Sequence, residues 1–217
     1  MKSIWLFLIL VTLAFSTLAS GWSKTQQNAN ETDMMEDSTV SLAGKKVLIV
    51  YLSRTNNTRA VAQIIQREVG GKMVALELVI PYPQNYKAIV AQVARENETG
   101  FLPPLKTKID SIGSYDVIFV GFPTWGMQLP PPMKSFLKQY DLGGKTIVPF
   151  NTNAGYGIGS TFETVKQLSP NSKVTEGFTI KGGIERDSVL FVMKGEKEKQ
   201  ARIEVKAWLG KIAGILE

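Results

Sequence analysis

The densest group of side chains that could bind a ligand follows a strongly apolar run at residues 46–52. Ser53, Thr55, Asn57 and Thr58 fall within six residues, where a helical pattern begins. A helix start offers unpaired backbone N–H groups and the positive end of the helix dipole, which favour an anion. Hydroxyl groups add donors that suit phosphate oxygens. Because the glycine pattern of a P-loop or dinucleotide site is absent, the run predicts either a site for one phosphate or an ordinary helix cap.

An aromatic loop follows a later apolar segment. Residues 122–132 read Phe-Pro-Thr-Trp-Gly-Met-Gln-Leu-Pro-Pro-Pro. Trp125, between a proline and a glycine, could form a rigid wall against which a flat ring stacks. The alternative is that Trp125 fills the core and that the prolines only end the neighbouring strand and helix.

A glycine-rich loop, residues 151–160, follows the next apolar segment. Its three glycines would let backbone N–H groups approach a ligand closely. Tyr156 could add a second ring or a hydroxyl. Taken alone, a loop of this kind is more often structural than part of a site.

The composition excludes several kinds of chemistry. The 217 residues contain no cysteine and no histidine. Thiol chemistry, disulfides, Cys/His zinc sites and Ser-His-Asp or Cys-His catalysis are therefore ruled out. No metal site and no catalytic side chain are predicted, and any chemistry has to rely on hydroxyls, carboxylates, amines, aromatic rings, backbone groups or a bound cofactor.

The charge balance bears on possible partners. Residues 42–217 carry 23 basic and 15 acidic residues, a net charge of +8. The basic residues are scattered, and no ladder of alternating aromatic and basic side chains accompanies them. We therefore expect no nucleic-acid binding, and we interpret the charge either as a solvated basic surface or as a surface that docks to acidic partners or anionic lipid.

The elements that must position these loops alternate along the chain. Apolar runs of strand length separated by helical patterns indicate a parallel sheet covered on both faces. We predict a doubly wound, five-stranded, three-layer α/β fold, with a hairpin-like insertion at residues 182–192. The expected strands are 46–52, 73–79, 115–122, 145–151 and 173–178, and the expected helices are 59–69, 86–96, 133–140, 158–168 and 195–216. Ligands of such sheets bind beyond the carboxyl ends of the strands, where the three loops would meet.

Residues 45–216 resemble the flavodoxin-like family, in the variant common among bacterial secreted flavodoxins. The matching pieces are residues 51–59, residues 123–126 with 130–133, and residues 151–159. The sequence departs from the family pattern in three ways. Asn56 stands where glycine is common, Trp125 is not followed by a second tryptophan, and the domain is basic. Asparagine tolerates a positive φ better than most residues, so Asn56 is compatible with the turn.

The resemblance implies that the chain binds flavin mononucleotide (FMN) and moves electrons. It implies that the phosphate is held by Ser53, Thr55, Asn57 and Thr58, and Arg54 would belong to the same cofactor site by offsetting the phosphate charge. It implies that the isoalloxazine ring is flanked by Pro123, Thr124, Trp125 and Gly126, and that its other side is closed by Asn153, Gly155 and Tyr156.

The N-terminal residues differ in kind from the rest. We interpret residues 1–20 as a signal peptide, because Lys2 precedes an apolar run at 4–11 and small residues follow at 16–21. The polar residues 21–41 are expected to form a disordered tether to a domain at 42–217. The expected location is periplasmic, secreted or membrane-tethered. Tethering would follow if the N-terminus stayed uncleaved, although the apolar run is shorter than the ~20 residues of a spanning helix.

Three functions remain open at this point. The first is an electron carrier that serves a redox partner protein or a small electron acceptor. The second is an FMN-dependent reductase that passes electrons from NADH or NADPH to a quinone or nitro compound. The third is a flavin-free α/β protein that binds an anionic ligand.

Overall fold

The computed structural model describes residue 42 and residues 44–216 of the chain. The predicted signal peptide (1–20) and tether (21–41) lie outside the described residues. Within the described part, no helix combines the length and the apolar character needed to cross a membrane.

The sheet has the doubly wound topology that the sequence predicts. Its strands are β1 (Val47–Tyr51), β2 (Lys72–Ala75), β3 (Val117–Pro123), β4 (Thr146–Asn153), β5 (Lys173–Val174) and β6 (Phe178–Lys181). Their order is β2-β1-β3-β4-β5, with β6 also paired to β4, and every pairing is parallel. The order places β1, β3 and β4 side by side in the middle of the sheet, and these three strands precede the three loops.

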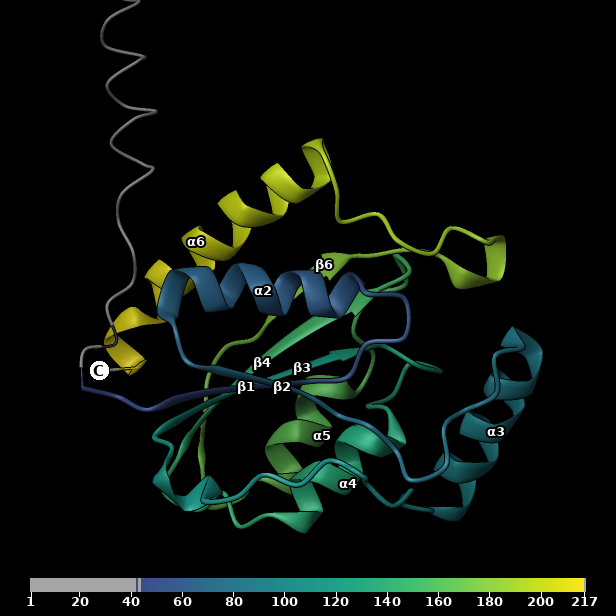
Figure 1. Ribbon diagram of the computed structural model, residues 1–217, viewed down its shortest axis with the longest axis horizontal. Coiled ribbons are helices and arrows are strands. Elements are labelled where there is room, and N and C mark those ends of the chain that lie inside the picture. The colour runs from purple at the N-terminus through teal and green to yellow at the C-terminus, as the bar shows by residue number, and fades with distance from the viewer. Residues whose placement is uncertain (1–41, 43, 217) are drawn as a thin grey trace, which may run out of the picture. The chain divides into compact units, whose positions relative to one another are not determined.

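Helices cover both faces of the sheet (Figure 1). The helices α2 (Asn57–Val69) and α6 (Glu196–Leu216) lie on one face, and α4 (Pro131–Gln139) and α5 (Thr161–Leu168) lie on the other. The helix α3 (Tyr86–Thr99) lies to one side, beyond the carboxyl ends of the strands. The three-layer fold predicted from the sequence is therefore confirmed.

The uninterrupted apolar strands are explained by this double cover. In β1, Val47 and Ile49 pack into the core on the α2 and α6 face, whereas Leu48 and Val50 pack into the core on the α4 and α5 face. Successive side chains of a strand point to opposite faces. Because both faces are buried, both sets of side chains have to be apolar.

Two predicted strands differ from the observed ones. The strand predicted at 73–79 ends at Ala75, because the chain then leaves β1 and Leu78 forms an antiparallel bridge with Leu105. The strand predicted at 173–178 is divided into β5, on the first residues of β4, and β6, on the last. Between them Gly177 passes so close to Phe162 that a Cβ would lie 2.6 Å from its ring.

The packing of β3 against β4 can be tested at Gly121. A Cβ at this position would lie 2.0 Å from the Phe150 ring on the neighbouring strand. We expect Gly121→Ala to lower the free energy of unfolding by about 1–3 kcal/mol, because overpacking forces buried groups to move. Urea denaturation measures the effect. The control is Gly210→Ala in α6, which has open space at its Cβ and should raise stability by about 0.5–1 kcal/mol; equal stability of the two variants would contradict this packing.

Candidate functional site

The hydroxyl-rich loop turns sharply into the first helix. Asn56 has φ 62° and ψ 0°, the left-handed conformation that asparagine accepts more readily than most residues. The backbone N–H of Arg59 donates to Ser53 Oγ at 3.2 Å, so Ser53 acts as a cap within this turn. Among the described residues, no backbone acceptor takes the N–H groups of Asn57 and Thr58. These two groups begin α2, where the positive end of the helix dipole lies.

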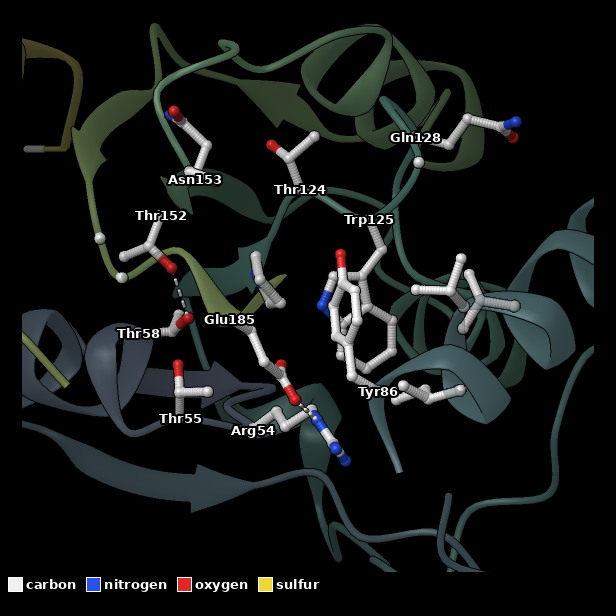
Figure 2. Close-up of a pocket in the computed structure, with 18 of the residues that line it drawn as sticks. Arg54, Thr55, Thr58, Tyr86, Thr124, Trp125, Gln128, Thr152, Asn153 and Glu185 are labelled. Carbon is white, nitrogen blue, oxygen red and sulfur yellow. Dashed lines mark hydrogen bonds and ion pairs between the residues drawn. The ribbon is translucent and has the colours of Figure 1, made fainter. Parts of the chain in front are cut away.

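Two threonines that are far apart in the sequence, Thr58 in α2 and Thr152 in β4, meet at the start of α2. The hydroxyls of Thr58 and Thr152 lie 2.8 Å apart, and both side chains are buried (Figure 2). One hydroxyl of such a pair donates to the other, which leaves the second proton free to donate elsewhere. The pair therefore presents a hydroxyl donor beside the open end of the helix.

Asn57 is buried and connects the first loop to the segment before α6. Its Nδ2 donates to Leu190 O at 2.6 Å and to Thr55 Oγ1 at 2.9 Å, and its Oδ1 accepts from Val192 N at 3.0 Å. The side chain is thus committed to protein partners. The Asn57 side chain therefore does not face a phosphate, and only the backbone N–H of this residue is available to donate to one.

Arg54 joins three segments around the same place. Its Nε forms an ion pair with Glu185 at 2.7 Å (Figure 2). Its Nη1 donates to Pro83 O at 3.1 Å, and its Nη2 donates to Gln84 O at 2.6 Å. The guanidinium therefore fixes the loop before α3 and the short helical turn at Glu185–Asp187 against the first loop.

The second loop makes a tight two-residue turn. Trp125 N donates to Gln128 O at 3.2 Å and Gln128 N donates to Trp125 O at 3.0 Å. Gly126 and Met127 both have positive φ, 57° and 60°, as turns of this mirror-image type require. The half-buried Trp125 ring meets Tyr82 edge-on, with centroids 5.5 Å apart.

The third loop is fixed by asparagines and by a close backbone approach. Asn151 is fully buried and donates to Phe122 O at 3.1 Å and Thr124 Oγ1 at 3.0 Å. The Oδ1 of Asn153 accepts from Gly155 N at 2.8 Å. A Cβ on Gly159 would lie only 2.0 Å from Met127 O, so the third loop packs directly on the second.

These loops enclose a cavity of about 470 Å³. Nine of the residues predicted for the site line it: Arg54, Thr55, Asn57, Thr58, Pro123, Thr124, Trp125, Gly126 and Asn153. In Figure 2 the threonines of the first loop lie on one side and the Trp125 ring on the other, with Glu185 between them in this view.

Three predicted residues lie outside the cavity wall. Ser53 is engaged as the cap of α2. Gly155 does not line the cavity; it lies beside the Lys181 side chain. The Tyr156 side chain is 64% exposed, its hydroxyl accepts from Arg186 Nη2 at 3.0 Å, and the guanidinium lies over its ring. That contact holds the ring away from the cavity.

Several lining residues were missed by the sequence reasoning, and most of them come from α3. Tyr86 begins this helix, and Ile89 and Val93 are buried against the cavity but belong to neither core cluster. Their spacing predicted a helix at 86–96 but no part in the site. The position of this helix in the chain could have indicated its role. It follows β2, and the carboxyl end of β2 lies at the same edge of the sheet as the three loops.

A positive charge lies close to the far end of the cavity. Lys134 Nζ donates to Asn97 Oδ1 at 2.9 Å and to Gln128 Oε1 at 3.4 Å, and both of these amides line the cavity. Burial lowers the pKa of the Lys134 ammonium below its usual value. Because the lysine donates to the amide oxygens, the two NH₂ groups are left free to donate.

Comparison with known proteins gives the family. The family model described as flavodoxin matches residues 46–194, more than half of the chain. The chain belongs to the flavodoxin family. A curated flavodoxin from Synechocystis sp. is 22% identical over 191 residues, covering 79% of this chain and 98% of that protein.

Two solved structures of flavoproteins are similar to this flavodoxin-family chain. A candidate flavoprotein from Bacteroides eggerthii is 29% identical, with a TM-score of 0.62, and covers 78% of this chain and 99% of its own. A flavoprotein from Lactobacillus acidophilus, solved in complex with FMN, is 21% identical with a TM-score of 0.56, covering 67% and 99% of the two chains. The family predicted from the sequence is therefore confirmed.

The contact between the second and third loops gives a test of how the cavity is shaped. We expect Gly159→Ala to force the two loops apart, because its Cβ would collide with Met127 O. The variant should lose more than 1 kcal/mol of stability and should bind any ligand of the cavity less tightly. The matched control is Gly195→Ala, whose φ of 57° equals the 56° of Gly159 within a degree but whose Cβ meets open space. Equal losses in both, measured by thermal unfolding, would show that backbone strain alone matters.

Proposed function

We propose that this chain binds FMN in the cavity and transfers electrons to a redox partner outside the cytoplasm. The observation that carries the proposal is the cavity itself, which unites the start of α2 with the Trp125 wall. Its volume of about 470 Å³ falls within the range of sites for small molecules and cofactors. Membership of the flavodoxin family and the FMN complex of the Lactobacillus acidophilus protein support FMN, as the sequence predicted.

The chemistry of one end of the cavity suits a phosphate. Thr55, Thr58 and Thr152 supply hydroxyls there, and the backbone N–H groups at the start of α2 supply fixed donors. Backbone donors at a helix start and a favourable dipole stabilise an anion without a nearby cation. Arg54 would contribute its charge at a short distance, while its own hydrogen bonds go to protein atoms.

The other end suits a flat aromatic ring. Trp125 and Tyr86 both line the cavity, together with the apolar side chains of α3. Aromatic walls stabilise a ring by stacking and exclude water from it. The amide groups of Asn97 and Gln128, oriented by Lys134, would offer donors to carbonyl oxygens at a ring edge.

The division of labour follows from these residues. Bound FMN would accept and release the electrons, and the chain would hold it, set its environment and limit its access. The hydroxyls and N–H groups would fix the phosphate. The Trp125 wall would keep water from one face of the ring and disfavour additional charge on it. No side chain is needed as a general acid or base in this scheme.

Location and partner are further parts of the proposal. The apolar run at 4–11, with Lys2 before it and small residues after it, supports export by a signal peptide. The net charge of +8 on residues 42–217 supports a partner with an acidic docking surface. Sequencing the N-terminus of the protein from its native host would test export, since a mature chain that begins near residue 21 is expected and one that begins at Met1 would contradict cleavage.

FMN binding is tested first by colour. Full-length protein purified without added flavin should show visible flavin absorbance, or should gain it with excess FMN. A protein that stays colourless under both conditions would overturn the proposal and would favour a flavin-free ligand.

The phosphate end is tested by comparing FMN with riboflavin. Thr58→Val removes one hydroxyl and should weaken FMN at least ten-fold relative to riboflavin, since a hydrogen bond to a charged group is worth about 1.5–3 kcal/mol. Ser53→Ala is the control, because Ser53 caps Arg59 and lies outside the cavity wall. Fluorescence titration gives both affinities; an unchanged ratio in the Thr58 variant would place the phosphate elsewhere.

The choice between carrier and reductase is tested by turnover. A carrier receives its electrons from another protein, and its flavin does not have to react with a nicotinamide. We therefore expect slow quinone reduction with NADH or NADPH alone, and fast exchange once a separate reductase supplies electrons. Rapid quinone or nitro-compound reduction by the purified protein would make it a reductase.

A further inference from the structure

A buried carboxylate lies behind the Trp125 wall. Glu96, on the third turn of α3, is 6% exposed. Two neutral donors hold it: the Tyr82 hydroxyl donates to Oε2, and Gln92 Nε2 donates to Oε1 at 2.8 Å. A buried carboxylate is costly unless its oxygens accept hydrogen bonds. The arrangement therefore depends on Tyr82 keeping its proton.

Tyr82 is the donor under ordinary conditions. Burial, the hydrogen bond to Glu96 and the negative charge of Glu96 all raise the pKa of the phenol well above its usual value. The phenol therefore stays protonated and hydrogen-bonded to the carboxylate. The residues that follow Tyr82 are also fixed in place, because Arg54 donates hydrogen bonds to the carbonyl oxygens of Pro83 and Gln84.

The other end of this arrangement reaches the cavity. The Tyr82 ring meets the Trp125 ring edge-on, at 5.5 Å between centroids and 80° between planes. Edge-to-face contacts of this kind have a definite geometry and contribute about 0.5–1.5 kcal/mol beyond burial. Two successive contacts, from Glu96 to Tyr82 and from Tyr82 to Trp125, thus connect the buried side of α3 to the wall of the cavity.

We infer that Glu96, acting through Tyr82, is a positioning residue that fixes the angle of the Trp125 wall. The inference deepens the proposed function, since that wall is where the flavin ring would stack. The buried charge has a second consequence, because a negative group behind the wall opposes the addition of electrons to a ring in front of it. On α4, Lys134 donates to Asn97, the residue that follows Glu96 on α3, so this lysine brings a positive charge to the same helix.

The first test needs no flavin. In full-length protein with ¹⁵N-labelled tryptophan, the indole N–H signal of Trp125 is assigned by its loss in Trp125→Phe. Glu96→Ala and Tyr82→Phe should shift or broaden this signal, whereas Glu96→Gln keeps an acceptor for the phenol and should leave it close to that of the native protein. Trp208, buried and bonded to Glu176 O at 3.2 Å, is the internal control for folding.

The second test uses bound flavin. Glu96→Ala and Tyr82→Phe should weaken FMN and riboflavin by the same factor, about five-fold or more, because they act on the ring end. Glu96→Gln should raise the reduction potential of the bound flavin, since it removes a charge and preserves the shape. Glu196→Gln, at a side chain that is 88% exposed, removes the same charge and should leave the potential unchanged.

The outcomes separate the two proposals. If the native protein binds no flavin, the proposed function fails while the tryptophan signal still decides whether Glu96 positions Trp125. A Trp125 signal that is unchanged in Glu96→Ala and Tyr82→Phe, with the Trp208 signal intact, overturns the positioning role. A potential that does not move in Glu96→Gln overturns the electrostatic consequence.

Discussion

The parallel register of β1, β3 and β4 is the constraint on which the site depends. Tyr51 pairs with Gly121, and Gly121 pairs with Phe150, so the three strands reach the same edge of the sheet together. The pairing continues into the loops, where Thr124 N donates to Thr152 O at 3.0 Å. A slip of one residue would turn every side chain to the opposite face. The buried apolar faces forbid that slip, and thereby fix where each loop begins.

Polar contacts between distant segments then give the loops their shape. The Thr58–Thr152 contact joins residues 94 apart, and the Arg54–Glu185 ion pair joins residues 131 apart. Neither contact contributes to the apolar core. Each is a directional contact between polar groups that are mostly or fully buried, so these contacts fix the geometry of the loops that the strands position.

Sequence reasoning succeeded where a local pattern determines structure. The uninterrupted apolar run in Val47–Tyr51 could predict a sheet covered on both faces, and the tolerance of Asn56 for positive φ could predict the first turn. It failed where a long-range contact decides. Tyr156 reads as a ring for the site, but Arg186 holds it outward. Tyr86 reads as an ordinary helical residue, but the position of α3 brings it to the cavity. At the division of the last predicted strand, Gly177 approaches the Phe162 ring closely, a long-range contact that no local pattern reveals.

The guanidinium of Arg54 is hydrogen-bonded to protein acceptors, so an anion bound at the first loop has to rely on other donors there. The Nε and both terminal nitrogens of its guanidinium donate to protein acceptors, and one of these is the carboxylate of Glu185. An incoming phosphate would compete with Glu185 for this charge, and displacing an ion pair would offset much of what a new one contributes. A neutral hydroxyl or backbone N–H can donate to a phosphate without an ion pair being broken. The backbone N–H groups at the start of α2 and the spare proton of the Thr58–Thr152 pair are therefore the groups best able to hold an anion here.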